Sequence, residues 1–437
     1  MAENQKFGSL ALTPGVTRGH VRALLYASFS TIGLLTFVGV ATPFVLNANL
    51  HVPASEQGRI SGGLVLWTEL TTLATFSLFG VVADRIGRRQ VWALGYLVMG
   101  LGYALYPYAE TTGELTLYRI IYALGVAATT CMLGTVVSDY PQERSRGRMV
   151  ALVGIANGLG VVLFAAVLAK LPRVLVERGL EPVAAGRVTL ALVAGVALVS
   201  GLVVALGLKP GLPVRREERL PVGELVRAGL RAMRNPRVAL AYSAAFVARG
   251  DLVILGTFVL LWGQSAAMAH GASAAEALER GRVPFIVAQS AALLWAGAIY
   301  FLIDRFNRVT GLAICLALAA LGYLSMYFVG DPTLRSSLPL FVLLGIGEIS
   351  AFFGAQVLIG QEAPIDRRGS VVAAFNFCGA IGILVTSKLG GWLFDHQGAW
   401  APFVMIGLVN LAVLLGALVV RARSPGEPVS EVDVVAS

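Results

Sequence analysis

The sequence predicts an all-α integral membrane protein in which twelve transmembrane helices form two pseudo-symmetric six-helix bundles, with both termini in the cytoplasm. Three observations predict this fold class. The 437-residue chain is 57% hydrophobic and 14% charged, whereas soluble domains carry about 25% charged residues. Apolar runs of about 20 residues, long enough to cross the hydrocarbon core, recur along the chain. Basic residues are concentrated in alternate loops, as they are in multi-pass membrane proteins.

Composition also limits the function classes. A mean hydropathy of +0.76 excludes a soluble globular protein and a disordered chain, because neither could expose so much apolar surface to water. The three cysteines lie in apolar runs, and the four histidines are scattered through loops and tails. These spacings predict no disulfide framework and no metal site. The sequence has no P-loop and no catalytic cluster, so we expect neither an enzyme nor a cofactor.

Twelve apolar runs define the predicted spans. About 20 residues precede the first run and no small-residue cleavage site closes it, so we expect a membrane helix rather than a cleaved signal peptide. The 50 glycines suit close packing between helices in lipid. The predicted spans cover residues 22–46, 60–83, 90–109, 115–137, 149–170, 188–208, 238–263, 283–303, 309–330, 337–360, 370–392 and 400–420.

The charge distribution sets the orientation. If the N-terminus lies inside, the inner loops, linker and tails carry 23 Lys and Arg residues and the outer loops carry 8. An excess of Lys and Arg marks the cytoplasmic side, so both termini are predicted to be cytoplasmic. The net charge of +9 is then a topology signal, and the expected partner is the lipid bilayer rather than nucleic acid.

The spans divide the chain into a first bundle (22–208) and a second bundle (238–421), joined by a linker (209–237) and flanked by cytoplasmic tails (1–21 and 422–437). Within the linker, apolar residues and arginines fall on different helical faces of residues 221–236. This pattern indicates an amphipathic helix, lying on the inner leaflet or solvated.

The two predicted bundles contain related motifs. After the second span the chain reads GVVADRIGRR (80–89), and after the eighth it reads YFLIDRFNR (300–308), an offset of 220 residues. After the fourth span it reads RGRMVALVG (146–154), and after the tenth RGSVVAAFN (368–376), an offset of 222. A near-constant offset in two separate motifs indicates a duplicated six-helix unit, which is typical of secondary transporters.

The motif at 80–89 matches the signature loop G-x-x-x-D-R-x-G-R-R/K of the major facilitator superfamily. With its span count and its long central linker, the chain resembles a secondary transporter of that family over residues 22–420. The resemblance implies that two six-helix halves rock about a central site to move a small molecule.

The resemblance also implies a cytoplasmic gate at this loop. Asp84 is expected to face the N-terminus of the eleventh helix, where the helix dipole favours a carboxylate, and so to stabilise the outward-facing state. Alternatively, the arginines only follow the positive-inside bias. The expected gate residues are Gly80, Asp84, Arg85, Gly87, Arg88 and Arg89, with Asp304, Arg305 and Arg308 in the second half. The candidate partners are Asp139, Glu143, Glu362 and Asp366.

Charged residues inside spans are costly, so they usually line a cavity or pair with each other. Most of those here fall on the fourth, seventh and tenth spans, which the resemblance assigns to the central cavity. Lys388 lies near the outer end of its span, where it can snorkel. The candidate substrate or proton-coupling residues are Glu69, Arg119, Arg249, Asp251 and Glu348.

Their chemistry suggests two roles. A low-dielectric cavity favours the protonated form of a carboxyl group, so Glu69, Asp251 and Glu348 are candidates for proton coupling. Arg119 and Arg249 offer bidentate donors for an anionic or zwitterionic substrate, or for a gating ion pair. Because they lie two residues apart, Arg249 and Asp251 should not pair. The plausible pairs are Arg249 with Glu348 and Arg119 with Glu69.

The expected function is therefore secondary active transport of a small organic solute, coupled to protons, by a monomer in a bacterial cytoplasmic membrane. Leu159 stands where the family's antiporter motif has proline, which disfavours export by antiport. The alternatives are a facilitative transporter, a drug-efflux transporter and, from another class, a membrane assembly factor that moves no solute.

Overall fold

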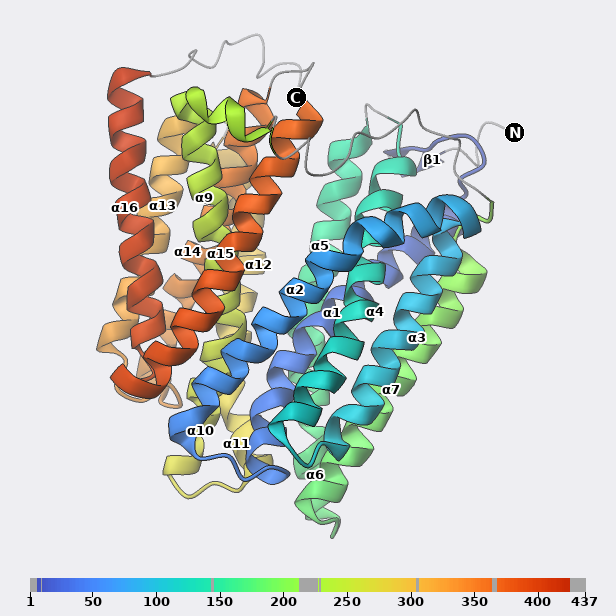
Figure 1. Cartoon of the computed structure of the whole chain (residues 1–437), viewed down its shortest axis with the longest axis vertical. Coiled ribbons are helices and arrows are strands. Elements are labelled where there is room, and N and C mark those ends of the chain that lie inside the picture. The colour runs from blue at the N-terminus through green and yellow to red at the C-terminus, as the bar shows by residue number, and fades with distance from the viewer. Residues whose placement is uncertain are drawn as a thin grey trace. The chain divides into compact units, whose positions relative to one another are not determined.

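The computed structural model describes residues 6–8, 10–142, 145–211, 227, 229–303, 306–363 and 368–424. Long helices dominate this part of the chain (Figure 1). The chain divides into two compact units, each made of three separate segments of the sequence. The first unit contains residues 1–53, 67–216 and 267–282, and the second contains 54–66, 217–266 and 283–437.

In the first unit, α1 packs against α5 and α7, and α3 packs against α4 and α7. The unit contains most of α2 (Ala54–Ile86) and the short helices η2 (Tyr106–Tyr108), α6 and α11. The remaining bounds are α1 (Arg18–Ala48), α3 (Arg88–Leu105), α4 (Thr112–Asp139), α5 (Arg146–Leu168), α6 (Leu171–Glu177), α7 (Pro182–Gly207) and α11 (Ala274–Gly281).

In the second unit, α9 packs against α14, α15 and α16, and α13 packs against α14 and α16. A π-helical segment, η5, continues α9 into α10, and short 3₁₀ turns precede or follow several helices. The bounds are η4 (Ala232–Arg234), α9 (Pro236–Val253), η5 (Ile254–Val259), α10 (Leu260–Ala269), α12 (Val283–Ile303), α13 (Arg308–Ser325), η6 (Met326–Phe328), η7 (Arg335–Ser337), α14 (Leu338–Glu362), α15 (Arg368–Gln397) and α16 (Ala401–Arg423).

The helical, membrane-spanning fold class is confirmed, and each of the twelve predicted spans coincides with a helix of the described residues. Eleven helical segments there are long and apolar enough to cross a bilayer. The other predicted span, 90–109, is α3 followed by η2. Several helices extend beyond the apolar runs through polar turns; α2, for example, starts at Ala54 rather than at residue 60.

The internal repeat also appears in the side-chain contacts. On α3, Tyr103 donates its hydroxyl to the carbonyl of Leu34 on α1. On α13, Tyr323 donates to the carbonyl of Asp251 on α9 at 2.8 Å. A tyrosine at the same place in each repeat therefore ties one helix of each unit to its neighbour.

Glycines repeat in the same way. A Cβ atom on Gly160 of α5 would lie 2.1 Å from the carbonyl oxygen of Phe29 on α1. A Cβ on Gly382 of α15 would lie 2.1 Å from that of Phe246 on α9. Only glycine allows backbones to approach this closely, so these two contacts fix how α1 meets α5 and how α9 meets α15.

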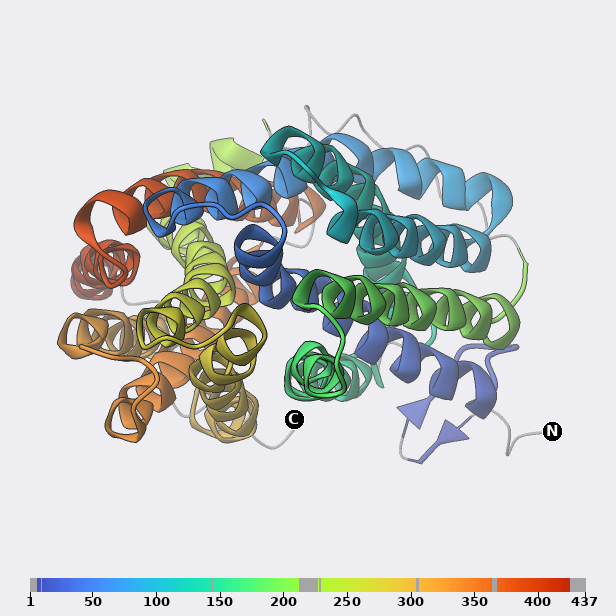
Figure 2. The same ribbon diagram turned by 90° about the horizontal axis from the view of Figure 1, so that it is seen from below.

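A short hairpin lies before α1, and Figure 2 shows its strands, β1 (Lys6–Phe7) and β2 (Leu10–Ala11), as two arrows. Leu10 and Leu12 are fully buried in the first unit. The Thr13 hydroxyl donates to the carbonyls of Asp139 and Tyr140 at the end of α4, at 3.0 and 3.1 Å. Burial raises the pKa of Tyr140 to about 12, so its hydroxyl stays neutral at cellular pH. The sequence analysis did not predict this hairpin.

Most of the linker, including residues 212–226 and 228, lies outside the described residues. The predicted amphipathic helix over 221–236 is therefore described only in its last part, where Met233 is exposed and Gly229 is buried. Gly229 lies against Ser370 of α15, and its carbonyl accepts a hydrogen bond from the Tyr242 hydroxyl at 2.9 Å.

Candidate functional site

A buried polar cluster lies inside the second unit. Asp251, near the end of α9, is completely buried. The Asn410 side chain on α16 donates from Nδ2 to Asp251 Oδ1 at 2.9 Å and to the carbonyl of Ile406 at 3.1 Å. Because Nδ2 makes both bonds, the orientation of the amide is fixed and Oδ1 of Asn410 faces away from them.

Glu348 on α14 completes the cluster. It is only 2% exposed, and α14 packs directly against α9, the helix that carries Asp251. Three oxygen atoms find no hydrogen-bond donor among the described residues: Asp251 Oδ2, Glu348 Oε2 and Asn410 Oδ1. We call Asp251, Glu348 and Asn410 the acceptor cluster.

The acceptor cluster has a clear chemical requirement. Buried polar atoms are nearly always hydrogen-bonded, and a carboxylate in a dry interior is costly to keep ionised. An added proton relieves both problems, since a protonated carboxyl becomes a donor and loses its charge. The arrangement is therefore suited to binding and releasing a proton.

The backbone beside the cluster is irregular. The π-helical segment η5 begins three residues after Asp251. Such bulges occur frequently at functional sites because they redirect side chains within a helix. The apolar run of this span gave no signal for the bulge.

Arg249 points to a different place from Asp251. Its guanidinium lies over the ring of Phe352, 5.7 Å from the ring centre, and its side chain lies against Gly379 of α15. Phe352 is one helical turn beyond Glu348 on α14. The pairing of Arg249 with Glu348 stays a prediction.

In the first unit, Arg119 on α4 is 5% exposed. Its Nε donates to Oγ1 of Thr68 on α2 at 2.8 Å, and its guanidinium lies 5.3 Å from the ring centre of Tyr122. Its Nη1 has no acceptor among the described residues. The bonded threonine is the neighbour of Glu69, which is half-buried, and the pairing of Arg119 with Glu69 stays a prediction.

Four of these charges have apolar residues at the equivalent positions of the other half. Matching contacts align α1 with α9, because Phe29 and Phe246 hold equivalent glycines, and Asp251 then corresponds to Leu34. By the same alignment Arg249 corresponds to an apolar position. The full set of equivalents is Ile32 for Arg249, Leu34 for Asp251, Val126 for Glu348 and Phe341 for Arg119.

The predicted gate motif covers the last turns of α2, the turn at Gly87 and the start of α3. Gly87 adopts φ +99°, a conformation that other residues rarely take. Arg88 makes an ion pair with Asp139 at the end of α4, one of the four candidate partners. Asp84 and Arg85 are exposed, whereas Gly80 and Arg89 are half-buried.

The other gate candidates are only partly described. Glu362 pairs with Arg237 at 2.9 Å. Arg308 is half-buried at the start of α13. Glu143, Asp366, Asp304 and Arg305 lie outside the described residues.

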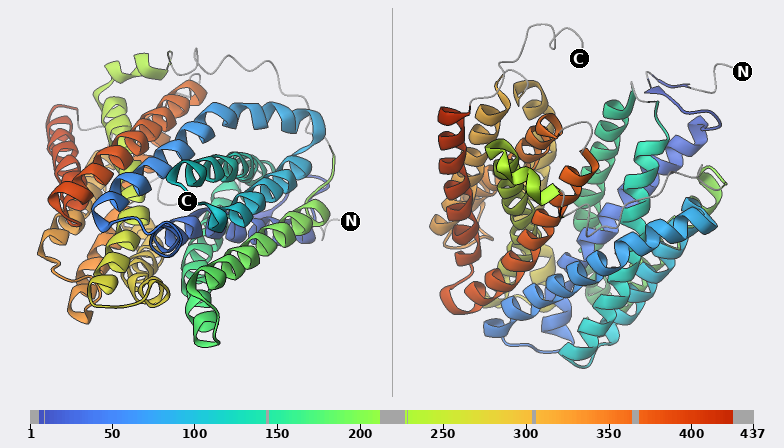
Figure 3. Two further views of the ribbon diagram at one scale, coloured as in Figure 1. Left: turned by 60° about the horizontal axis from the view of Figure 1, so that its bottom comes forward. Right: turned by 45° about the horizontal axis from the view of Figure 1, so that its top comes forward.

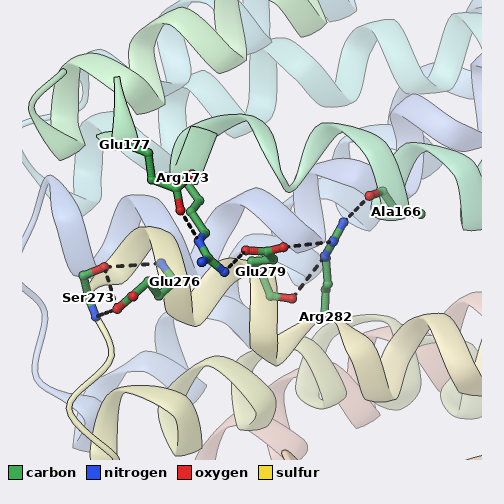
Figure 4. Close-up of polar contacts among 7 residues, drawn as sticks. All are labelled: Ala166, Arg173, Glu177, Ser273, Glu276, Glu279 and Arg282. Carbon is green, nitrogen blue, oxygen red and sulfur yellow. Dashed lines mark hydrogen bonds and ion pairs between the residues drawn. The ribbon is translucent and has the colours of Figure 1, made fainter. Parts of the chain in front are cut away.

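A second polar cluster, which the sequence analysis did not predict, surrounds α11 (Figure 4). Arg173 of α6 bonds to Glu177 at 2.8 Å and to Glu279 of α11 at 2.6 Å. Arg282 donates from Nη1 to the carbonyls of Ala165, at 2.8 Å, and Ala166. The only sequence signal was the capping box Ser273–Glu276, which starts α11.

No cluster of three or more His, Cys, Asp or Glu side chains within the described residues is arranged to hold a metal ion.

Several known proteins are similar to this chain. The magnetosome protein MamH of Paramagnetospirillum magneticum is 29% identical over 91% of both chains. The magnetosome protein MamZ of the same species is 25% identical over 90% of this chain, which spans 62% of MamZ. The inner membrane transport protein YajR of Escherichia coli is 22% identical over 92% of this chain and 84% of YajR.

Solved structures share the fold. The nucleoside transporter NupG superimposes with a TM-score of 0.68 at 14% identity, over 91% of this chain and 98% of NupG. A D-xylose–proton symporter gives 0.65 at 17% identity, over 91% and 96%. Residues 23–387 and 283–435 match the sequence model of the Major Facilitator Superfamily. The chain is therefore a multi-pass membrane protein that belongs to the Major Facilitator Superfamily, a family of transporters rather than enzymes.

Proposed function

We propose that the protein is a secondary active transporter that moves a small organic solute across a bacterial cytoplasmic membrane, as a monomer, by coupling its movement to protons. The observation that carries the coupling is the acceptor cluster. Its two buried carboxyl groups and its amide each carry an oxygen that meets no donor in the described part of the chain. The family membership supports transport itself.

In this mechanism, Asp251 and Glu348 take up a proton when the site is open to the side of higher proton concentration. Protonation removes one buried charge and supplies a donor within the cluster. Asn410 holds Asp251 in place through Oδ1, so Oδ2 is the atom left to exchange a proton. Glu69 is a second candidate in the other unit.

The arginines are proposed to hold the solute. Nη1 of Arg119 meets no acceptor within the described ranges, and a buried guanidinium without a full set of acceptors favours an anionic group. Arg249 is the matching candidate in the second unit. The substrate class that suits them is a small anionic or zwitterionic organic molecule.

Alternating access is proposed to follow the rocker-switch scheme. The cytoplasmic gate would consist of Gly80, Asp84, Arg85, Gly87, Arg88 and Arg89, and Asp304, Arg305 and Arg308 would form its second copy. The motif residues do not distinguish coupled from uncoupled transport, but an uncoupled transporter of the same fold would need no acceptor cluster, which favours proton coupling over facilitated transport.

The test begins with a thermal-shift screen of small organic anions and zwitterions against the purified protein at several pH values. Any stabilising solute is then offered to proteoliposomes with and without an inward proton gradient. The gradient should increase uptake several-fold. In Glu348→Gln and Asp251→Asn, uptake driven by the gradient should fall at least about tenfold, and Glu69→Gln tests the second candidate.

The matched control is Glu181→Gln, which removes an exposed carboxyl group before α7. It should leave gradient-driven uptake unchanged. Uptake that ignores the gradient, and persists in all three acidic variants, would contradict proton coupling but not transport.

A second candidate function follows from the first relatives, which are named magnetosome proteins and match along nine tenths of this chain. The chain could serve at a magnetosome, including as a non-transporting assembly factor. Expressing it in a P. magneticum strain that lacks MamH tests this. If the Glu348→Gln variant restores magnetosomes in this strain, and the strain without the chain has none, assembly is favoured over transport.

A further inference from the structure

Two short segments are grouped with the opposite sequence repeat. Residues 54–66, the start of α2, belong to the second unit, and residues 267–282, which include α11, belong to the first. By sequence, α2 is part of the first six-span half, and α11 precedes the eighth span in the second half. The contacts of these segments therefore link the two sequence halves, on the side predicted to be outer.

The first link is the arginine clasp, defined as Arg173, Glu279 and Arg282. Arg282 is 5% exposed and donates to two carbonyls in the last turn of α5, which have no partner within a helix. A cation at a helix C-terminus is also favoured by the dipole. Glu279 pairs with Arg173 at 2.6 Å. In Figure 4, Glu279 lies between the two arginines.

The second link is the aspartate clasp, defined as Asp395, Gly58 and Arg59. The carboxylate of Asp395, near the end of α15, accepts hydrogen bonds from the backbone N–H groups of Gly58 and Arg59, both at 2.7 Å. These groups lie in the second turn of α2, beyond the reach of most of the dipole effect, so the two charge-assisted hydrogen bonds hold the carboxylate. Figure 3 shows the start of α2 beside the end of α15.

Glycines bring the backbones together at the aspartate clasp. A Cβ on Gly62 would lie 2.1 Å from the carbonyl oxygen of Ser387, and one on Gly391 would lie 2.5 Å from that of Gly58. Contacts between backbone atoms cannot be kept by a change of side-chain rotamer when one helix moves away from the other. The charge–dipole contacts also weaken over about one helical turn. Both clasps are therefore made or broken, with little in between.

We propose that the arginine clasp and the aspartate clasp together form the outer gate of the transporter, and that both break when its central site opens outward. This inference rests on the proposed alternating-access function. The arginine clasp places a cation on the C-terminus of α5, and the aspartate clasp places an anion near the N-terminus of α2. In each clasp one of the two partners is a backbone group, which no side-chain substitution can remove.

The test measures a distance rather than transport. Spin labels are attached at Thr112→Cys, the exposed first residue of α4, and at Leu334→Cys, in the exposed loop before α14. Cys131, Cys315 and Cys378 are first replaced by alanine. The unmodified clasps should give mainly the shorter distance. Arg282→Met and Asp395→Asn should each increase the ratio of longer to shorter distance about tenfold, because each removes charged hydrogen bonds.

Together the two substitutions should increase the ratio about a hundredfold if the clasps act independently. Arg282→Lys, which keeps the charge, should restore most of the shorter population. The matched controls are Arg280→Met, an exposed arginine on α11, and Glu181→Gln, and neither should change the ratio.

A cross-link tests the outer gate in a second way, which does not depend on whether the Arg282 and Asp395 variants fold. A disulfide between Arg173→Cys and Glu279→Cys should remove the longer distance, and reductant should return it. Unchanged distances in Arg282→Met, Asp395→Asn and the cross-linked protein would overturn the outer gate, even if uptake is normal. A shift in distance without any solute uptake would instead keep the gate and contradict the proposed transport.

Discussion

At the scale of single residues, the acceptor cluster depends on Asn410. Its amide is the only donor to the Asp251 carboxylate among the described residues, and it also donates to the carbonyl of Ile406 within α16. The amide therefore occupies Oδ1 of Asp251 with a hydrogen bond and leaves Oδ2 without one. This makes Asn410 a positioning residue for the proposed proton site.

Asn410→Leu tests that role. The substitution leaves Asp251 Oδ1 buried without a donor, which should cost about 1–3 kcal/mol of stability and lower the melting temperature. It should also move the pH at which gradient-driven uptake is half-maximal, because Asp251 loses a contact that favours its ionised form. Leu415→Ala, on the exposed face of α16, is the control and should change neither property. An unchanged pH profile would contradict the positioning role.

Sequence reasoning found Asp251 and Glu348 because charges stand out within apolar runs. It missed Asn410, since a lone polar residue in a span is usually a helix–helix hydrogen bond, and its partner depends on how α9 meets α16. The sequence could not show which helices contact Asp251. Its carbonyl accepts a hydrogen bond from α13 and its carboxylate accepts one from α16. The spacing of two residues excluded only the pair within α9.

At the scale of elements, close glycine contacts decide how helices pair. Gly382→Ala would place a Cβ 2.1 Å from the carbonyl oxygen of Phe246, and neither backbone can move aside freely. We expect a loss of about 1–3 kcal/mol, measured as a lower melting temperature in detergent. Gly416→Ala on α16, where a Cβ meets nothing within 4 Å, should be neutral or slightly stabilising.

The positions of the membrane spans were predictable because hydrophobic length is set by the bilayer, whereas the polar ends of the helices were not. What the sequence did not reveal were elements too short or too polar to follow that rule, such as α6, α11 and the hairpin of β1 and β2. The π-helical segment η5 was also hidden, because its residues continue the same apolar run. These elements depend on tertiary contacts, such as Glu279 with Arg173, rather than on local pattern.

At the scale of the whole molecule, the repeat in the motifs is also a repeat in contacts. Gly160 and Gly382 hold equivalent places, as do Tyr103 and Tyr323. Positions where the two repeats carry different kinds of residue are candidates for a role other than folding. Asp251, whose equivalent in the first repeat is Leu34, is one of them. Substitution of Asp251 by Leu is expected to fold and to lose coupling.

The repeat makes a further prediction about stability. Gly160→Ala should destabilise the protein by about as much as Gly382→Ala, because each Cβ would meet a carbonyl oxygen at 2.1 Å. The two sites lie in different units, so the double variant should show the sum of the two losses. A double variant much less stable than that sum, judged by thermal unfolding, would show that the units do not respond independently.

The hairpin before α1 has a practical consequence for anyone preparing the protein. Leu10 and Leu12 are buried, and the Ala11 N–H donates to the Ser145 hydroxyl at 2.9 Å, so this stretch is part of the folded body. Trimming the chain back to Arg18, as its apolar pattern alone would suggest, would strip a packed layer from the end of α4. Purification handles and fluorescent fusions therefore belong after α16.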